Sequence, residues 1–274
     1  ESVSKEIWNS FLNSPKYAMI EDGKLIKRRK SDGSWHKTFE PPDRSLLPDG
    51  TPLREEYYNP IDPDTSVALP IAFKMIDPKS NLSKRTLESL ELLWNQRWYN
   101  GGYGRYNIKS EPDSPGPWPF ATMFVTRAYI ENGNRDKVIR NLDWMIDISE
   151  GIGSWFEFYG WRPIPPCPPP GIIPWVWAEI LICLVFNMIG VQPTKNSVII
   201  KPKLLKITKK LSSMFYIGNN FINIDIEYSN KIKQSYAILN KKEKIPLKNG
   251  VIEIPKTGKN ELLKIYLNSK NYEF

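Results

Sequence analysis

The sequence predicts a mainly α-helical chain that is followed by a small antiparallel β-sandwich. Over residues 1–194 apolar side chains recur at helical spacing, as Leu87, Leu90 and Trp94 do. Over residues 195–274 short runs of alternating or β-branched residues are separated by turn residues, which is typical of antiparallel strands. These runs lie at 198–200, 221–227, 235–239, 251–254 and 262–267.

Composition divides the chain at the same place. The 274 residues include 38 Lys and Arg against 30 Asp and Glu, for a net charge of +8. All 10 Trp lie within 1–194, whereas 195–274 is rich in lysine and has no arginine. We therefore expect a helical domain with long aromatic loops over 1–194 and a Lys-rich β-sandwich module over 195–274, joined near 192–196. The hydrophobic share of 41% excludes wholesale disorder.

The positive charge does not by itself indicate a nucleic-acid partner. The lysines of 195–274 are scattered along strand-like segments, and no arginine is present there for bidentate base or phosphate contacts. A solvated lysine face is the simpler interpretation, so we expect no nucleic-acid partner.

Six helices are expected from apolar spacing and capping residues. They cover 6–13, 65–76, 84–94, 117–132, 135–149 and 175–189. The residues that bound them are, in chain order, Ser14-Pro15, Asp64 or Thr65, Asp77-Pro78, Ser83, Gly133, Asn134 and Gly190. Pro70 lies inside the second segment and predicts a kink or a late start there.

The apolar segment 171–191 has the length of a membrane span. Glu179 near its middle would cost about 2.5–3.5 kcal/mol in a bilayer, and no basic residues flank the segment. We therefore expect a helix that is buried inside the protein, no membrane span, and a Glu179 carboxylate bonded to a neighbouring loop backbone.

Long and short connections alternate between these helices. The long ones are 14–64, 99–117 and 150–173. Antiparallel helix pairs with short links place their long loops at one common end, and long loops in compact domains are usually functional. The aromatic, glycine and charged residues of the three loops are therefore expected to share one rim.

The loop 99–106 reads Tyr-Asn-Gly-Gly-Tyr-Gly-Arg-Tyr. Its glycines permit close backbone approach, Arg105 offers a rigid fork of donors, and aromatic faces suit the C–H faces of sugar rings. No strand precedes the glycines, so they do not form a dinucleotide fingerprint. A purely structural aromatic turn is the alternative.

The loop 153–161 surrounds one carboxylate, Glu157, with five aromatic residues. Partial desolvation there would raise the pKa of Glu157 and suit it to proton transfer. A Glu157 that points to solvent or pairs with Arg162 is the alternative.

Several other chemistries are not supported. His36 is the single histidine, so a zinc site or a Ser-His-Asp triad has no convincing set of residues. A calcium site around Asp62 and Asp64 lacks the EF-hand pattern. We expect no metal and no cofactor. Cys167 and Cys183 could pair, but two cysteines do not form a disulfide framework.

Together these residues resemble a known family. The order is Asp64 to Pro70, Ile76-Asp77-Pro78, Thr86 to Trp94, Gly101-Gly102-Tyr103-Gly104-Arg105-Tyr106, Pro117-Trp118, then Tyr129, Gly133, Asn134 and Trp144. It is similar to the second half of the catalytic domain of glycoside hydrolase family fifteen, the glucoamylase-like enzymes, over roughly 60–190. The resemblance implies an (α/α)6 toroid of six helical hairpins and inverting hydrolysis by one carboxylic acid and one carboxylate that activates water.

The resemblance also implies roles for particular residues. Glu157 lies where the family has its general base, Arg105 matches the substrate-binding arginine, and Trp118 matches a tryptophan near the sugar. The expected substrate-binding set is Arg105, Tyr106, Trp118, Glu111, Asp64, Trp155 and Trp161, with Asp113 as an alternative to Glu111.

Two departures from the family pattern matter. The sequence around Glu157 is Ser-Trp-Phe-Glu-Phe rather than Leu-Pro-Glu-Gln, and the β-module that starts near 199–202 is more like that of the α-rhamnosidases. The toroid also needs twelve helices, twice the number found. The family's general acid would lie upstream of Glu1, so we expect the C-terminal part or subunit of a larger enzyme. Fallback acids within the chain are Glu40, Glu55, Glu56 and Asp64.

The expected function is therefore an inverting, exo-acting glycosidase acting on an oligosaccharide or polysaccharide, completed by an N-terminal segment or companion chain. Alternatives are an α-rhamnosidase-like enzyme, a non-catalytic glycan-binding or cell-surface protein, and a half-toroid scaffold for another protein. The sequence leaves the cellular location open, with an extracellular or cell-surface position favoured.

Overall fold

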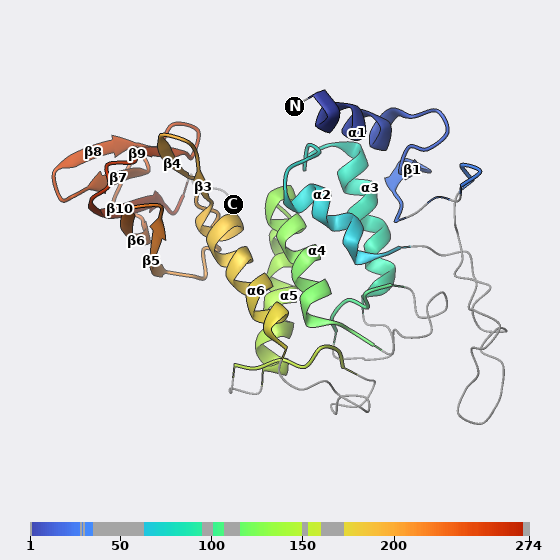
Figure 1. Cartoon of the computed structure of the whole chain (residues 1–274). Helices are drawn as coiled ribbons and strands as arrows, with labels where there is room; N and C mark the ends of the chain where they lie inside the picture. Colours follow the sequence, from blue (N-terminus) through green and yellow to red (C-terminus); the bar gives the residue numbers. More distant parts are fainter. Residues whose placement is uncertain are drawn as a thin grey trace. The chain divides into compact units, whose positions relative to one another are not determined.

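The computed structural model describes residues 2–27, 29, 31–34, 63–94, 101–106, 116–149, 153–159 and 173–270 (Figure 1). The chain divides into two compact units, Glu1–Ile180 and Leu181–Phe274. The boundary expected from composition, near 192–196, lies further along the chain. Each unit is described by itself.

The first unit contains most of the helices. They are α1 (Ser2–Asn13), α2 (Leu69–Ala72), α3 (Asn81–Leu90), α4 (Pro119–Asn132), α5 (Arg135–Ile148) and α6 (Pro174–Ile182), of which α6 runs past the end of the unit. The 3-10 turns η2 (Thr65–Ala68) and η3 (Glu91–Leu93) adjoin α2 and α3. A hairpin of β1 (Ile20–Glu21) and β2 (Lys24–Leu25) follows α1.

Helix ends follow local chemistry, with two differences from expectation. Gly133 ends α4 at φ 82°, and the Asn134 side chain caps α5 by accepting from the Lys137 backbone N–H. Ser80, not Ser83, caps α3. The second helix is only four residues long, because Lys74 adopts φ 57° and ends the helical turn well before Ile76.

The core of the first unit is built around α4. This helix is buried along almost its whole length and contacts α2, α3, α5 and η2. In Figure 1 the green helices α4 and α5 run side by side. Fully buried side chains from several elements meet there, among them Ile71, Leu90, Met123 and Val138. Their packing fixes the ends of the long loops.

The second unit is a region of strands that follows the π-helix η4 (Cys183–Ile189). The strands are β3 (Val191–Pro193), β4 (Ser197–Ile200), β5 (Lys210–Ile217), β6 (Asn220–Ser229), β7 (Tyr236–Leu239), β8 (Glu243–Pro246), β9 (Ile252–Pro255) and β10 (Asn260–Asn268). They form a five-stranded sheet of order β5-β6-β10-β7-β8 and a three-stranded sheet of order β3-β4-β9. Alternate residues are buried, as the β6 pattern of Ile222, Ile224 and Ile226 shows.

The predicted fold class is wrong. The residues that the structure describes form a mixed α/β fold, with six α-helices, then a C-terminal region of strands, and three small sheets in all. The fold is neither mainly α nor a twelve-helix toroid. Short helices such as α2 and the exposed α1 do not supply the long hairpins that a toroid requires. The five-stranded sheet is also not purely antiparallel, because β6 and β10 are parallel.

The apolar segment is buried only in part, and not throughout as expected: Cys183, Asn187, Met188 and Ile189 of η4 are buried, but most of α6 is not. Within α6 only Val176 is buried, whereas Trp175, Trp177 and Leu181 are exposed. Among the described residues, the Glu179 carboxylate accepts from the Arg127 guanidinium at 2.8 Å and not from a loop backbone. Throughout the described ranges, no helix has both the length and the apolar character that a membrane crossing needs.

Candidate functional site

The described ends of the three long loops meet around one extended segment, 101–106. Its isolated β-bridges are Trp94↔Tyr103, Gly104↔Pro117 and Asp64↔Tyr106. The Thr65 N–H donates to the Arg105 carbonyl at 2.9 Å, and the Tyr159 N–H donates to the Pro117 carbonyl at 2.9 Å. Backbone hydrogen bonds therefore bring together parts of the chain that lie up to about a hundred residues apart.

Arg105 lies on the exposed side of this segment, above aromatic rings. Its guanidinium carbon is 5.3 Å from the Tyr106 ring centroid and 5.5 Å from that of Trp118. The Trp118 ring lies 5.1 Å from Phe158, with the two planes tilted by 32°. Arg105, Tyr106 and Trp118 were all predicted as substrate-binding residues, and the structure brings the three together.

Glu157 completes this rim of Arg105, Tyr106, Trp118 and Phe158. Its side chain is partly buried, and this desolvation raises its pKa, while the positive charge of Arg105 acts in the opposite direction. The net shift is upward, so Glu157 is a more basic carboxylate than a solvated glutamate. The predicted alternative, a pair with Arg162, lies outside the described residues.

The indole of Trp118 has an unused donor. The ring is 5% exposed, and its Nε1–H is buried without a hydrogen-bond acceptor among the described residues. A buried donor of this kind normally has a partner, so the Trp118 Nε1–H still requires an acceptor.

Asp64 reaches the rim but is already engaged. One carboxylate oxygen accepts from the Ser66 N–H at 2.8 Å, which caps η2, and the other lies 3.7 Å from Lys27 Nζ. The Lys27 ammonium in turn lies 5.3 Å from the Tyr106 ring centroid. Asp64 is therefore positioned as a structural cap beside the predicted site, and sequence reasoning did not anticipate Lys27 there.

Trp155 is held by the helices. Its indole N–H donates to the Met145 carbonyl at 2.8 Å, and its ring meets Trp177 edge to face at 5.0 Å. Other predicted positions, Glu111, Trp161, Asp113, Glu40, Glu55, Glu56, His36 and Cys167, lie outside the described residues.

The glycines of the first loop are required by the protein's own packing. Gly101 and Gly102 adopt φ 106° and 84°. A Cβ on Gly102 would overlap the Trp144 ring and lie 2.6 Å from the Pro117 Cβ. The residues that approach the glycine backbone closely are thus Trp144 and Pro117 of the protein itself. This agrees with the alternative that the loop is a structural aromatic turn.

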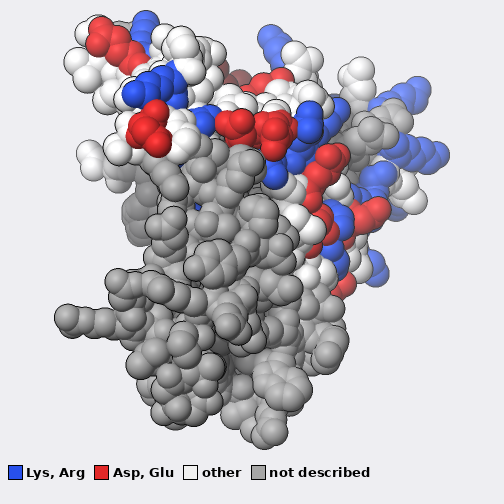
Figure 2. All heavy atoms as spheres, turned by 90° about the vertical axis from the view of Figure 1, so that its right-hand side faces the viewer, with Lys and Arg blue, Asp and Glu red and all other residues white. Residues whose placement is uncertain are grey.

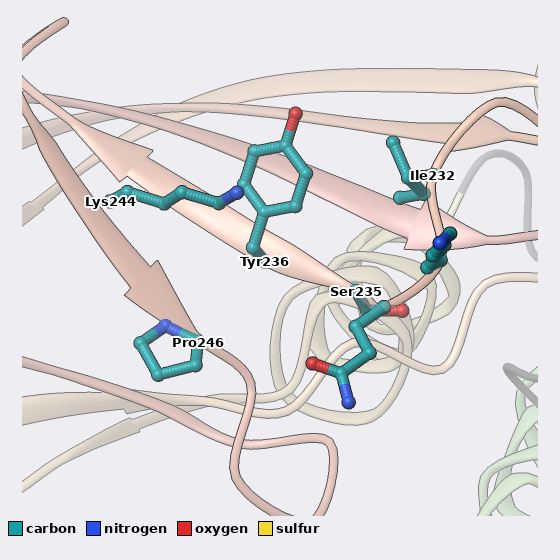
Figure 3. Close-up of a pocket in the computed structure, with 7 residues that line it drawn as sticks. Ile232, Ser235, Tyr236, Lys244 and Pro246 are labelled. Atoms are coloured by element: carbon teal, nitrogen blue, oxygen red, sulfur yellow. The ribbon is translucent and has the colours of Figure 1, made fainter.

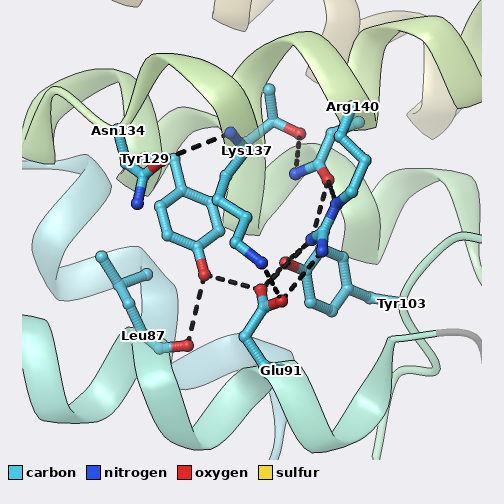
Figure 4. Close-up of polar contacts among 9 residues, drawn as sticks. Leu87, Glu91, Tyr103, Tyr129, Asn134, Lys137 and Arg140 are labelled. Carbon is cyan, nitrogen blue, oxygen red and sulfur yellow. Dashed lines mark hydrogen bonds and ion pairs between the residues drawn. The ribbon is translucent and has the colours of Figure 1, made fainter.

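A second polar cluster was not predicted (Figure 4). The Glu91 carboxylate accepts from the Tyr103 hydroxyl, from Tyr129 at 2.7 Å and from Arg140 at 2.9 and 3.1 Å. Lys137 forms a further ion pair with it. We refer to these five residues as the Glu91 cluster.

The electrostatics of the Glu91 cluster favour the charged carboxylate. Burial by itself raises the pKa of Glu91, but hydrogen bonds from Arg140, Lys137 and both tyrosines outweigh it and lower the pKa to about 2. Burial raises the pKa of Tyr103 and of Tyr129. The Arg140 guanidinium also lies 3.6 Å from the Trp94 ring centroid. The cluster ties α3, the first loop, α4 and α5 together.

A sequence signal for this cluster did exist. Glu91 lies four residues after Leu87, so it continues the buried row of α3, and Arg140 lies four residues before the buried Trp144. Charged residues at core spacing indicate an internal ion pair. No basic partner can be chosen for Glu91 from the sequence alone.

The remaining surface offers no metal centre among the described residues, because no group of three or more His, Cys, Asp or Glu side chains converges there. On the face drawn in Figure 2, Lys and Arg lie beside Asp and Glu over the described part of the surface.

No protein-family model matches the sequence, and no curated protein matches it either.

Proposed function

We propose that this chain is the C-terminal part or a subunit of an inverting, exo-acting glycoside hydrolase in which Glu157 is the general base. The observation that carries the proposal is the aromatic rim itself, in which Arg105 lies 5.5 Å from the Trp118 ring and Trp118 packs on Phe158, the residue after Glu157. Aromatic faces pack against the C–H faces of sugars, and the guanidinium donates to hydroxyl groups.

The environment of Glu157 suits the removal of a proton from water. A general base is most effective when its pKa approaches the working pH, and desolvation moves the pKa of Glu157 in that direction. The nearby positive charge of Arg105 keeps the group ionised. In inverting hydrolysis the base and the acid stand about 6.5–9.5 Å apart, with room for one water. The proposal assigns the acid to another segment of the enzyme or to a companion chain, since Asp64 is engaged by Ser66 and Lys27.

The test is hydrolysis by the complete enzyme of p-nitrophenyl α-glucoside and α-rhamnoside. Glu157→Gln is expected to lower kcat about 10²–10⁴-fold with little change in KM, because it removes proton transfer and leaves binding intact. The matched control is Glu88→Gln, an exposed carboxylate on α3. NMR of the first-formed anomer reports inversion. Full activity of Glu157→Gln contradicts the assignment.

The pH profile gives a second readout of the same site. The acid limb of kcat/KM should lie above the ordinary glutamate range, because burial raises the pKa of Glu157. Arg105→Gln should move this limb to still higher pH, since Arg105 lowers that pKa.

A non-catalytic glycan-binding protein is the second candidate. Asp64 is already bonded to Ser66 and lies beside Lys27. Glu157 is therefore the one carboxylate of the described rim without a hydrogen-bonded partner, whereas hydrolysis requires two carboxyl groups. This candidate predicts sugar binding that Trp118→Ala weakens, with no turnover of either glycoside.

A further inference from the structure

The second unit contains a pocket of about 720 Å³ between the turn that precedes β7 and strand β8 (Figure 3). It is lined by Ile232, Lys233, Gln234, Ser235, Tyr236, Lys244 and Pro246. Two of these residues are cationic and none is acidic. A volume of this size is within the range of small-molecule sites.

The two lysines of the pocket have no close acidic partner. No described carboxylate lies within 4.0 Å of the Lys233 or Lys244 ammonium. The Lys244 ammonium instead lies 4.2 Å from the Tyr236 ring centroid, and Figure 3 shows its chain extending toward that ring. Two cations in a concave site that lack an ion-pair partner among the described residues raise the local concentration of anions.

Asn268 fixes the conformation of the turn 232–235 that lines one side of the pocket. This residue is 5% exposed, and its side-chain amide donates to the carbonyls of Ile232 at 2.8 Å and Lys233 at 2.9 Å. The Asn268 N–H donates to the Ser235 hydroxyl at 2.8 Å, which leaves the hydroxyl proton of Ser235 able to donate. The turn is therefore positioned before any ligand arrives, which reduces the entropic cost of binding.

We propose that this pocket binds an acidic sugar residue of a polysaccharide, with its carboxylate held between Lys233 and Lys244. Pro246 and Ile232 provide apolar contacts for the C–H faces of the sugar, and Ser235 and Gln234 provide hydrogen bonds for its hydroxyls. A compact ammonium group suits a single carboxylate, whereas bidentate phosphate recognition generally uses arginine. The anionic character of the ligand rests on the pocket, and the choice of a sugar rests on the proposed function.

The test is a calorimetric titration of the full chain with trigalacturonic acid, with maltotriose as the neutral counterpart. We expect trigalacturonic acid to bind and maltotriose to bind at least tenfold more weakly. High salt should weaken the binding of trigalacturonic acid, because it screens the attraction between the charges. Lys244→Gln and Lys233→Gln should each lower the affinity for trigalacturonate about tenfold. Lys210→Gln, an exposed lysine of β5 on the opposite edge of the sheet, is the matched control and should change nothing.

Three results would overturn the proposal: no binding of trigalacturonate at millimolar concentration, equal affinity for maltotriose, or equal affinity for a short oligothymidylate of the same charge. The last would indicate a general polyanion surface. The test is independent of catalysis. Lys244→Gln should hydrolyse neutral glycosides at the normal rate, and Glu157→Gln should bind trigalacturonate normally, so either proposal can fail without the other.

Discussion

Tyr103 and Arg105 lie two residues apart on one extended segment, yet their environments are opposite. Tyr103 is fully buried and donates to Glu91, whereas Arg105 is exposed above Trp118. Side chains at positions i and i+2 usually share one face of a strand. The left-handed Gly101 and Gly102 and the bridges to three different segments interrupt that rule here. The motif therefore serves both the core and the rim.

Glu91 should make stability depend on pH in the acid range. Its folded-state pKa of about 2 lies below its usual value of 4.5, so the stabilisation is complete above about pH 4.5 and is lost as pH falls toward 2. This shift corresponds to at most about 3 kcal/mol, and partial solvent exposure reduces it to about 2 kcal/mol. Urea unfolding at pH 7 should show Glu91→Gln to be less stable by that amount.

The control for this prediction is Glu88→Gln, an exposed carboxylate on the same helix, which should change the free energy of unfolding by less than about 0.5 kcal/mol. The difference between wild type and Glu91→Gln should shrink between pH 4.5 and pH 2. A difference that stays constant over this range would show that the charge of Glu91 is not the stabilising feature.

At the scale of elements, the loop 101–106 depends on glycine through packing. Gly102→Ala would force Ala into φ 84° and drive its Cβ into the Trp144 ring and Pro117. We expect a loss of about 2–4 kcal/mol, since backbone strain and overpacking both contribute. Gly153→Ala is the matched control, because its φ is 63° but its Cβ would meet only Trp177 at 3.7 Å. It should cost about 1 kcal/mol.

Thermal unfolding followed by tryptophan fluorescence measures both variants, since Trp94 and Trp144 flank the loop. Equal losses for Gly102→Ala and Gly153→Ala would mean that the loop yields to make room for the methyl group, and that the Trp144 packing does not confine it.

For the molecule as a whole, the division into two units predicts separable stability. All 10 Trp precede the second unit, so tryptophan fluorescence reports on Glu1–Ile180 alone. Ile224 lies in the core of β6 and is 1% exposed. Ile224→Ala should lower the stability of the second unit by about 2–4 kcal/mol through the cavity that it leaves. Amide exchange of β6 and β10 measures this loss.

The fluorescence transition of Ile224→Ala should match that of wild type. Ile207→Ala, at 73% exposure in the same unit, is the control and should leave both measurements unchanged. A fluorescence midpoint that moves together with amide exchange would show that the units unfold as one cooperative body.

Local signals in the sequence determined several features of the structure. Gly133 and Asn134 separate α4 from α5, and Gly190 ends the apolar helical segment, because glycine and asparagine act on the backbone at their own positions. The strand-rich character of the second unit follows equally from side-chain alternation. Arg105, Tyr106 and Trp118 could be grouped in advance because two of them share one loop and the third begins the next helix.

The pairing of distant segments followed from the folded structure and not from local signals. It made β10 parallel to β6, paired Glu179 with Arg127, and gathered Arg140 and Lys137 around Glu91. The physical reason is that each of these arrangements depends on a partner far away in the chain. Apolar spacing and capping residues determine the local conformation of a segment. Whether a charged side chain can be buried depends on which oppositely charged residue packs beside it in the folded protein.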